Sequence, residues 1–228
     1  MNLKMSNQLT LLIPAKFESE SLPIFLEELK EYNYKKLVVL DRTDISTIKS
    51  IKEFSDVEIF YQQKAGYGNA LIEGINYINT DLFCIINADG SMDPKELIGM
   101  INLINNDHDI VFGSRYMKGA SSDDDDLITL FGNFIFTLIG KIFFGLKISD
   151  ILYTYLIGKT RLVKELNLKS GDFKFCIELP IRAKRNKLKC ISYPCHERNR
   201  IGGKKKVNPL VDGFKILVGM ISLFFNKK

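Results

Sequence analysis

The stretch Leu82–Ser91, LFCIINADGS, decides the fold of this chain. Its first five residues, Leu82–Ile86, are all apolar, which is typical of a short strand that is buried on both faces. The residues that follow include Asn87, Asp89 and Gly90, and these residue types favour turns. We therefore expect a buried strand that ends in a polar turn.

Short apolar runs and amphipathic helical segments alternate on both sides of this strand. Strands are predicted at residues 9–13, 36–40, 57–61 and 110–112, and helices at residues 22–29, 45–54, 68–77 and 94–105. Apolar strands with helices between them indicate an α/β fold, in which helices cover both faces of a mostly parallel sheet. Ligands of such sheets bind beyond the carboxyl ends of the strands. This rule predicts a site at four segments: Ala15–Glu18, Asp41–Thr43, Lys64–Gly68 and Asn87–Ser91.

Two long apolar stretches, Leu127–Leu146 and Leu210–Phe225, distinguish the second half of the chain. Three interpretations are open for the first stretch: burial against the core, a helix lying in the plane of a membrane interface, and a membrane span. The second stretch is short for a span and contains Asp212 and Lys215. The acidic segment Ser121–Asp126, SSDDDD, is interpreted as a solvated loop, because adjacent carboxylates repel one another.

Length, composition and charge exclude several classes of protein. A chain of 228 residues suits one domain, and 46% hydrophobic with 26% charged residues excludes a disordered protein. A net charge of +5 is too small to indicate nucleic-acid binding, and the Lys204–Lys206 run lacks interleaved aromatic residues. The four cysteines do not form the two ligand clusters of a zinc site, so reduced thiols are expected. We recognise no secretory signal, which favours a cytoplasmic protein.

Three polar segments indicate phosphate chemistry. Asn87, Asp89 and Ser91 offer oxygen atoms that a hard divalent cation accepts, although the same residues also suit an ordinary turn after a strand. The small-residue turn Lys64–Ala70 allows backbone N–H groups to approach a phosphate. The basic segment Glu197–Lys206 is interpreted either as a loop that closes over a diphosphate or as a flexible surface loop.

The order and spacing of the segments resemble those of family 2 glycosyltransferases, in the branch of the dolichol-phosphate mannose and glucose synthases. Leu40 and Asn87 stand where that family has aspartates, and Thr154 stands where it has a glycine. The resemblance runs from about Leu11 to Leu217. Its segments are LLIPAKFESESLPIFLEEL, LVVLDRTDIST, KAGYGNALIEGI, CIINADGSMDPKEL, DIVFGSRYMKGA, SDILYTYLIGKTRLVKEL and the tail that begins at Phe173.

This resemblance implies a GT-A-type, Rossmann-like fold with apolar helices near the C-terminus. It implies inverting transfer of a hexose from a nucleoside-diphosphate sugar to a polyprenyl phosphate, with dolichyl and undecaprenyl phosphates as examples. Residues 1–120 would bind the nucleotide sugar, and residues 121–228 would bind the acceptor. Two alternatives are a polysaccharide-extending transferase with a sugar hydroxyl as acceptor and a nucleotide-sugar-binding module without turnover. The expected place of work is the cytoplasmic face of a membrane, with no nucleic-acid partner.

The resemblance also implies roles for single residues. Asp89, Asn87 and Ser91 would hold Mg²⁺ or Mn²⁺, and the amide at Asn87 is expected to weaken that binding. Asp89 and Arg200 are predicted to be catalytic. Glu178, on the helix expected at residues 173–185, is either the base for a hydroxyl acceptor or an ordinary glutamate at the surface or core edge of that helix. The remaining predicted residues would bind the donor nucleotide (Pro14, Ala15, Glu18, Asp41, Lys64, Gly66, Gly68, Asn87 and Ala88) or a phosphate of donor or acceptor (Arg115, Arg198, Arg200 and Lys206).

Overall fold

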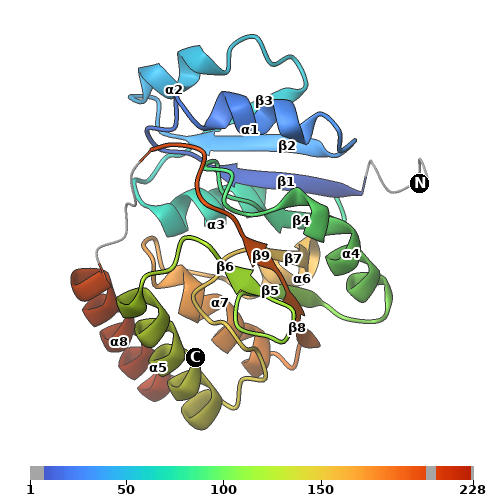
Figure 1. Cartoon of the computed structure of the whole chain (residues 1–228). Helices are drawn as coiled ribbons and strands as arrows, with labels where there is room; N and C mark the ends of the chain where they lie inside the picture. The colour runs from blue at the N-terminus through green and yellow to red at the C-terminus, as the bar shows by residue number, and fades with distance from the viewer. Residues whose placement is uncertain (1–7, 204–208, 227–228) are drawn as a thin grey trace.

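The computed structural model describes residues 8–203 and 209–226 and shows a seven-stranded sheet with helices on both faces (Figure 1). The order of the strands across the sheet is β3-β2-β1-β4-β7-β5-β8. The predicted α/β fold is therefore confirmed. The strands of the sheet are β1 (Leu9–Pro14), β2 (Lys35–Leu40), β3 (Val57–Tyr61), β4 (Leu82–Ile85), β5 (Ile110–Ser114), β7 (Leu156–Lys159) and β8 (Cys190–Pro194).

The sheet is parallel except at β7, which lies antiparallel between β4 and β5. The sequence did not predict this strand, because its four residues, LIGK, are too few to show a pattern. Since β7 and β8 come from the second half of the chain, both halves share one sheet. A short parallel pair, β6 (Ser121–Ser122) and β9 (His196–Glu197), lies outside the large sheet.

Helices cover the two faces of the sheet because the strands are apolar on both sides. One core contains Phe25 of α1 and Met100 of α4, and the other contains Leu71 of α3 and Phe175 of α7. The predicted helices are confirmed, although α2 ends four residues earlier than expected and a short 3₁₀ turn, η1, precedes α4. The elements are α1 (Leu22–Leu29), α2 (Ile45–Ser50), α3 (Tyr67–Tyr77), η1 (Pro94–Glu96), α4 (Leu97–Asn105), α6 (Thr160–Glu165) and α7 (Phe175–Arg185).

Two further helices, α5 (Leu127–Phe144) and α8 (Pro209–Phe225), pack on each other and on α7 (Figure 1). The carboxylate of Asp126 caps the start of α5 by accepting a hydrogen bond from the Thr129 N–H at 2.7 Å. The helix ends at Gly145, whose φ of 65° lies in the left-handed region that favours glycine. The sequence therefore defines both ends of this apolar helix.

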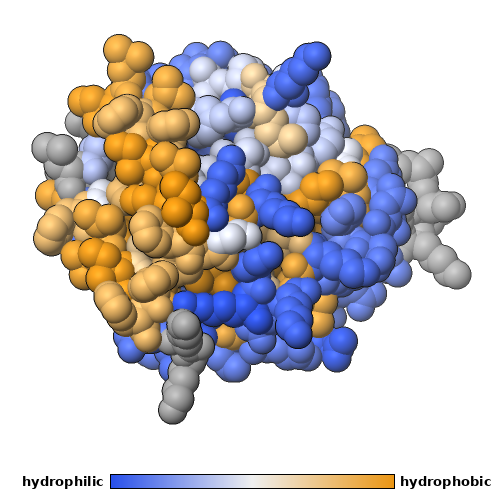
Figure 2. Space-filling view, turned by 90° about the horizontal axis from the view of Figure 1, so that it is seen from below, coloured by the Kyte–Doolittle hydropathy of each residue, from blue (hydrophilic) through white to orange (hydrophobic). Residues whose placement is uncertain are grey.

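The outward side of the α5–α8 pair is apolar and exposed. Only 17% of α5 is buried, so the interpretation that this stretch is buried against the core is wrong. The helix is long and apolar enough to cross a membrane, and both membrane interpretations stay open. Figure 2 shows the apolar side as a broad orange area on the left, where Figure 1 places these helices. Its exposed residues include Leu127, Ile128, Phe131, Phe134, Ile142 and Phe143 of α5 and Val211, Phe214, Val218, Ile221 and Phe225 of α8.

Candidate active site

The turns that follow β2, β1 and β4 lie at one edge of the sheet, because these strands are parallel neighbours. Asp41 follows β2, Ala15–Glu18 follows β1, and Asn87–Ser91 begins just after β4. Neighbouring strands lie about 4.8 Å apart, so the outer two turns are separated by about 10 Å. The fourth predicted segment, Lys64–Gly68, follows β3, which is the parallel neighbour of β2. The fold thus gathers all four predicted segments at this edge.

Two acidic residues predicted to contact a nucleoside lie in this edge. Asp41 accepts hydrogen bonds from the N–H and the hydroxyl of Thr43, at 2.8 and 2.7 Å, and these bonds lower the pKa of its carboxyl. The Glu18 carboxylate is 8% exposed and accepts a hydrogen bond from the Ser21 hydroxyl at 2.6 Å. Both side chains are thus held in place near the ends of β1 and β2, and their contact with a nucleoside stays a prediction.

The other residues predicted to bind the donor nucleotide have simpler surroundings. Pro14 is the last residue of β1, and the N–H of Ala15 donates to the Val39 carbonyl at 2.9 Å. Ala88 is buried, whereas the Lys64 side chain is exposed at the start of the glycine turn. Lys206 lies outside the described residues.

The turn after β4 is held by hydrogen bonds within itself. The Asp89 Oδ1 atom accepts from the Ser91 N–H at 3.1 Å and from the Ser91 hydroxyl at 2.8 Å. Ser91 is 3% exposed, so its hydroxyl is used inside the turn. Gly90 has a φ of 74°, and a side chain at this position would overlap Ile201. Glycine is therefore required here both by the backbone conformation and by the space available.

Tyr67, a residue that the sequence analysis did not select, connects the start of α3 to this turn. Its hydroxyl donates to the Asn87 Oδ1 atom at 3.2 Å and is hydrogen-bonded to the Thr154 hydroxyl at 2.7 Å. Its ring stacks on Phe173 with the ring centroids 5.2 Å apart, and burial raises the pKa of Tyr67. Asn87 and Thr154 are two of the positions that depart from the family pattern, and the structure joins them through one hydroxyl.

The glycine turn before α3 packs against backbone. A side chain at Gly66 would overlap the Gly171 carbonyl, and one at Gly68 would overlap the carbonyls of Ser170 and Asp172. The N–H of Asn69 donates to the Gly171 oxygen at 3.1 Å. The sequence predicted that this turn leaves room for a phosphate. The structure instead fills the space beside the glycines with residues 170–172.

This packing gives an expected stability result. Gly68→Ala should destabilise the fold by about 2 kcal/mol or more, because the added methyl group meets backbone that cannot move aside freely. Gly132→Ala should instead stabilise the fold by about 0.5–1 kcal/mol, since this helical glycine has open space around it. Urea unfolding of the two variants beside the unaltered chain measures both effects. A Gly68→Ala variant as stable as the unaltered chain would contradict the packing.

Glu178, the candidate base for a hydroxyl acceptor, holds the segment that packs on the glycine turn. Its carboxylate accepts from the N–H groups of Lys169 at 2.9 Å and Ser170 at 2.7 Å and from Arg182 Nε at 2.7 Å. Burial acts to raise the pKa of Glu178, but these hydrogen bonds outweigh it and lower the pKa. Because all these partners favour the ionised form and occupy both oxygens, we revise the role of Glu178 from base to structural support.

The segment Glu197–Gly203, which we call the strap, crosses the turn after β4 (Figure 1). The N–H of Arg198 donates to the Ser91 carbonyl, and the N–H of Ile201 donates to the Asp89 carbonyl, both at 2.8 Å. The Arg198 guanidinium binds the Gly90 carbonyl at 2.7 Å and the Glu28 carboxylate at 2.8 Å. Arg198 was predicted to bind a phosphate. Its partners indicate instead that it fastens the strap to the turn.

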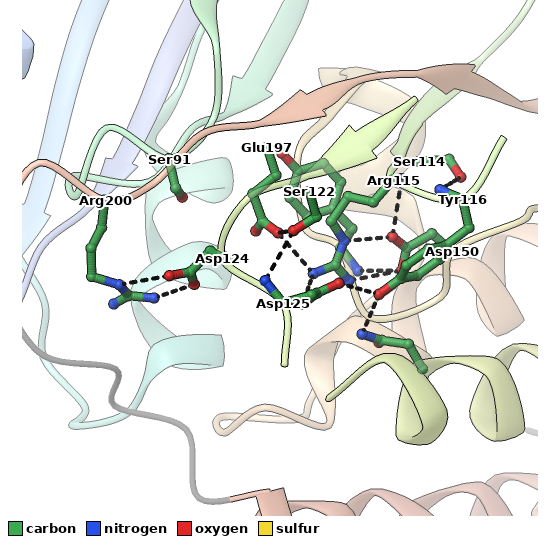
Figure 3. Close-up of polar contacts among 12 residues, drawn as sticks. Ser91, Ser114, Arg115, Tyr116, Ser122, Asp124, Asp125, Asp150, Glu197 and Arg200 are labelled. Atoms are coloured by element: carbon green, nitrogen blue, oxygen red, sulfur yellow. Dashed lines mark hydrogen bonds and ion pairs between the residues drawn. The ribbon is translucent and has the colours of Figure 1, made fainter. Parts of the chain in front are cut away.

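Arg200 of the strap is placed beside Asp89 and the acidic segment. Figure 3 shows its guanidinium facing the carboxylate of Asp124. Its guanidinium donates to the two oxygens of Asp124 at 2.7 and 3.3 Å, and an Arg200 nitrogen lies 3.8 Å from Asp89 Oδ2. Asp124 is the first of the partners that raise the pKa of Arg200. The structure thus brings together two predicted catalytic residues and adds Asp124, which the sequence analysis assigned to a solvated loop.

A second arginine, Arg115, lies at the centre of a buried ion-pair network (Figure 3). Its guanidinium contacts Asp150 at 2.8 Å, Asp125 at 3.1 Å and Glu197 at 3.2 Å. The side chain of Arg115 is only 7% exposed, and Asp150 is fully buried. We therefore revise two predictions. Arg115 ties β5 to the strap where a phosphate-binding role was expected, and the segment Ser121–Asp126 is a partner of both arginines where a solvated loop was expected.

The predicted metal ligands do not form a coordinating set. The Ser91 hydroxyl donates to Asp89 Oδ1, the Asn87 Oδ1 atom accepts from Tyr67, and Asp89 Oδ2 faces Arg200. Mg²⁺ and Mn²⁺ need several converging oxygen ligands. Across residues 8–203 and 209–226, no three His, Cys, Asp or Glu side chains gather at one point in a way that would hold an ion. The residues present therefore fit a divalent cation poorly.

Comparison with known proteins places this chain in a family. The sequence profile of glycosyl transferase family 2 matches residues 10–166. The dolichol-phosphate mannosyltransferase of Pyrococcus furiosus is 26% identical over an alignment of 192 positions, which covers 79% of this chain and 54% of that protein. This chain thus spans about half the length of the Pyrococcus protein. The UDP-N-acetylglucosamine–dolichyl-phosphate N-acetylglucosaminyltransferase of Methanococcus voltae is 23% identical, with 95% of this chain and 96% of that protein covered.

A solved structure supports the same fold. Glucosyl-3-phosphoglycerate synthase of Mycobacterium tuberculosis, crystallised with Mn²⁺, UDP-glucose and phosphoglyceric acid, superposes with a TM-score of 0.71 at 13% identity. The superposition covers 97% of this chain and 81% of that structure. The family profile covers more than half of the chain, and the mostly parallel sheet with its covering helices agrees with the fold of that structure. The chain therefore belongs to glycosyl transferase family 2 and is a glycosyltransferase with a GT-A-type fold.

Proposed function

We propose that this chain transfers a sugar from a nucleoside diphosphate to a polyprenyl phosphate at a membrane surface. The observation that carries the proposal is the position of Arg200 relative to the exposed apolar helices. Asp124, which binds Arg200, lies only three residues before Leu127, the first residue of α5 and 83% exposed. A lipid whose chain lies along the apolar side would therefore bring its phosphate close to the Arg200 guanidinium at the sheet edge.

The chemistry follows from the charges at this edge. An oxygen of the acceptor phosphate attacks the anomeric carbon of the sugar, and the bond from that carbon to the diphosphate breaks. A phosphate monoester has a second pKa of about 6, so the attacking oxygen is ionised at neutral pH and needs no base. Arg200 would stabilise the charge that develops on the diphosphate. Attack from the side opposite the leaving group inverts the configuration at the sugar.

A phosphate acceptor also agrees with the position of the acidic side chains. A sugar hydroxyl needs a carboxylate to take its proton, and the predicted base, Glu178, has its oxygens occupied by Lys169, Ser170 and Arg182. The names of the Pyrococcus and Methanococcus relatives also refer to dolichyl phosphate. We assign donor binding to residues 1–120 and acceptor binding to residues 121–228, which include the strap.

The activity is tested by an acceptor screen. The full chain is incubated with radiolabelled UDP- or GDP-sugars and with dolichyl phosphate, undecaprenyl phosphate or a short oligosaccharide. We expect label to enter the organic phase only with a polyprenyl phosphate. Label that appears on the oligosaccharide instead would support a hydroxyl acceptor, and nucleotide binding without any sugar transfer would support a binding module.

Membrane binding is a separate expected result. Replacing Phe131 and Phe134 with serine should lower the fraction of protein that sediments with vesicles by about tenfold or more, because each phenylalanine contributes about 1.5–3 kcal/mol when buried. The control replaces Ile24 and Ile98, which are 57% and 50% exposed on α1 and α4, with serine. Equal loss in both variants would show that the α5–α8 side is not the membrane contact.

The way in which α5 meets the membrane is also testable. Its side-by-side packing with α8 and α7 favours a helix that lies in the membrane interface while the domain stays in the cytoplasm. Alkaline carbonate should therefore release the protein from vesicles. Protein that resists this treatment would support a membrane span.

A further inference from the structure

The hydroxyl of Tyr67 fixes the orientation of the Asn87 amide. Tyr67 has one hydroxyl proton, and the Asn87 Oδ1 atom can only accept a hydrogen bond. The Tyr67 hydroxyl therefore donates its proton to Oδ1, with the two oxygens 3.2 Å apart. The Thr154 hydroxyl then donates to the Tyr67 oxygen at 2.7 Å. The Tyr67 ring is held by stacking on Phe173. These contacts make a one-way chain of hydrogen bonds, Thr154 to Tyr67 to Asn87.

This orientation leaves the Asn87 Nδ2 group as the part of the amide that a ligand can reach. Within the described part of the chain, no residue accepts a hydrogen bond from Nδ2, and Nδ2 is not among the buried atoms without a partner. Asn87 is half-buried at the end of β4. An amide NH₂ group donates hydrogen bonds to phosphate or hydroxyl oxygens, but it cannot coordinate a cation.

The positive charge near Asp89 comes from the protein itself. The Arg200 guanidinium lies 3.8 Å from Asp89 Oδ2 and is held there by Asp124. An arginine fork matches the oxygens of a phosphate and stays protonated at any physiological pH. Arg200 therefore brings a permanent positive charge to Asp89, and Nη1, the nitrogen that Asp124 does not bind, is the one that lies beside Asp89.

We propose that this chain binds the diphosphate of its donor without a divalent cation, through the Asn87 Nδ2 group and Arg200. Tyr67 is the positioning residue that turns the amide toward the ligand. The inference rests on the proposed function, because it concerns the same donor. The departures from the family pattern at Asn87 and Thr154 then belong together, because both side chains bind the Tyr67 hydroxyl.

The test measures nucleotide binding by calorimetry on the full chain, with UDP and GDP in EDTA or in Mn²⁺. The dissociation constant of the unaltered chain should differ by less than about threefold between EDTA and Mn²⁺, because no ligand set is complete. Asn87→Asp should weaken binding in EDTA, since the carboxylate repels the diphosphate. The same variant should regain about tenfold or more in Mn²⁺, because two carboxylates two residues apart then face the ion.

Tyr67→Phe tests the positioning role directly. Without the hydroxyl, the amide is free to turn, so binding in EDTA should weaken while a response to Mn²⁺ appears. A general loss of structure would not create a response to Mn²⁺, so this readout separates positioning from folding. Tyr77→Phe removes the same atom from a tyrosine bonded to Glu58 and should leave binding in both buffers unchanged.

Three outcomes are decisive. Equal binding in both buffers, with a response to Mn²⁺ in Asn87→Asp, supports the inference. Nucleotide binding by the unaltered chain that requires Mn²⁺ overturns the inference and leaves the proposed transfer standing. No nucleotide binding in either buffer overturns the proposed transfer, and the inference falls with it.

Discussion

Arg200→Ala is expected to lower the rate of sugar transfer by about 10²–10³-fold. Enzymes that lose one hydrogen-bond donor aimed at developing negative charge slow down by this amount. Arg200 brings a positive charge beside Asp89, and Asp124 holds the Arg200 guanidinium in place. The fold should survive the change, because Asp124 and Asp89, the carboxylates that lose their partner, are 21% and 16% exposed and can be hydrated. Initial rates with a labelled donor and a polyprenyl phosphate measure the effect.

The control for this variant is Arg161→Ala, which removes an arginine that is 83% exposed and far from the strap in sequence. It should leave the rate unchanged. Arg200→Lys keeps the charge but loses the forked geometry, so we expect an intermediate rate. An Arg200→Ala variant that retains more than about a tenth of the activity would contradict the role of Arg200 in stabilising the leaving group.

Arg115→Met is expected to have the largest effect on stability, a loss of about 3–5 kcal/mol, because it leaves buried carboxylates without their partner. Asp150 is fully buried, and Asp125 and Glu197 are nearly so. These carboxylates join the acidic segment, the strap and the loop before β7. Urea unfolding at neutral pH measures the loss, with Arg161→Ala as a control that should change stability by less than about 0.5 kcal/mol.

The pH dependence of this variant gives a second check. Burial raises the pKa of Glu197, and Arg115 opposes that rise, so removing the arginine should raise the pKa further. A carboxyl group whose pKa is higher in the folded than in the unfolded state contributes stability at a pH below its unfolded pKa. That contribution is lost as the pH rises through the pKa of the folded state. The loss of unfolding free energy in Arg115→Met should therefore be smaller near pH 5 than near pH 8. A deficit that is constant with pH would contradict the electrostatic cause.

Much of the fold is predictable from sequence because its core strands are apolar without interruption. LFCII and KLVVL indicate buried parallel strands, and helical spacing at Leu22, Phe25, Leu26 and Leu29 indicates a covering helix. β7 escaped prediction because its partners, β4 and β5, supply the hydrogen bonds that make it a strand. Its own residues carry no such signal.

The position of the candidate site was predictable from the sequence, but its contacts were less so. The rule about carboxyl ends of strands located Asp41, Glu18 and Asp89 correctly at one edge. It could not show that Arg115 pairs with Asp150, because a buried ion pair and a phosphate-binding arginine look alike in sequence. The roles of Tyr67 and Asp124 depend on contacts with Asn87 and Arg200 that are distant along the chain. Tyr67 lies in the glycine turn, and Asp124 lies in the acidic segment. The only sequence indication of their roles is that they belong to these two segments.

The exposed side shared by α5 and α8 begins next to the acidic segment that holds Arg200. A transferase that rests on this side meets its lipid acceptor by diffusion in two dimensions, while the water-soluble donor arrives in three. Turnover would then follow the mole fraction of acceptor in the bilayer. Adding inert lipid at a constant amount of enzyme and acceptor should slow the reaction by dilution within the surface, and the enzyme would pass from one acceptor to the next without leaving the vesicle.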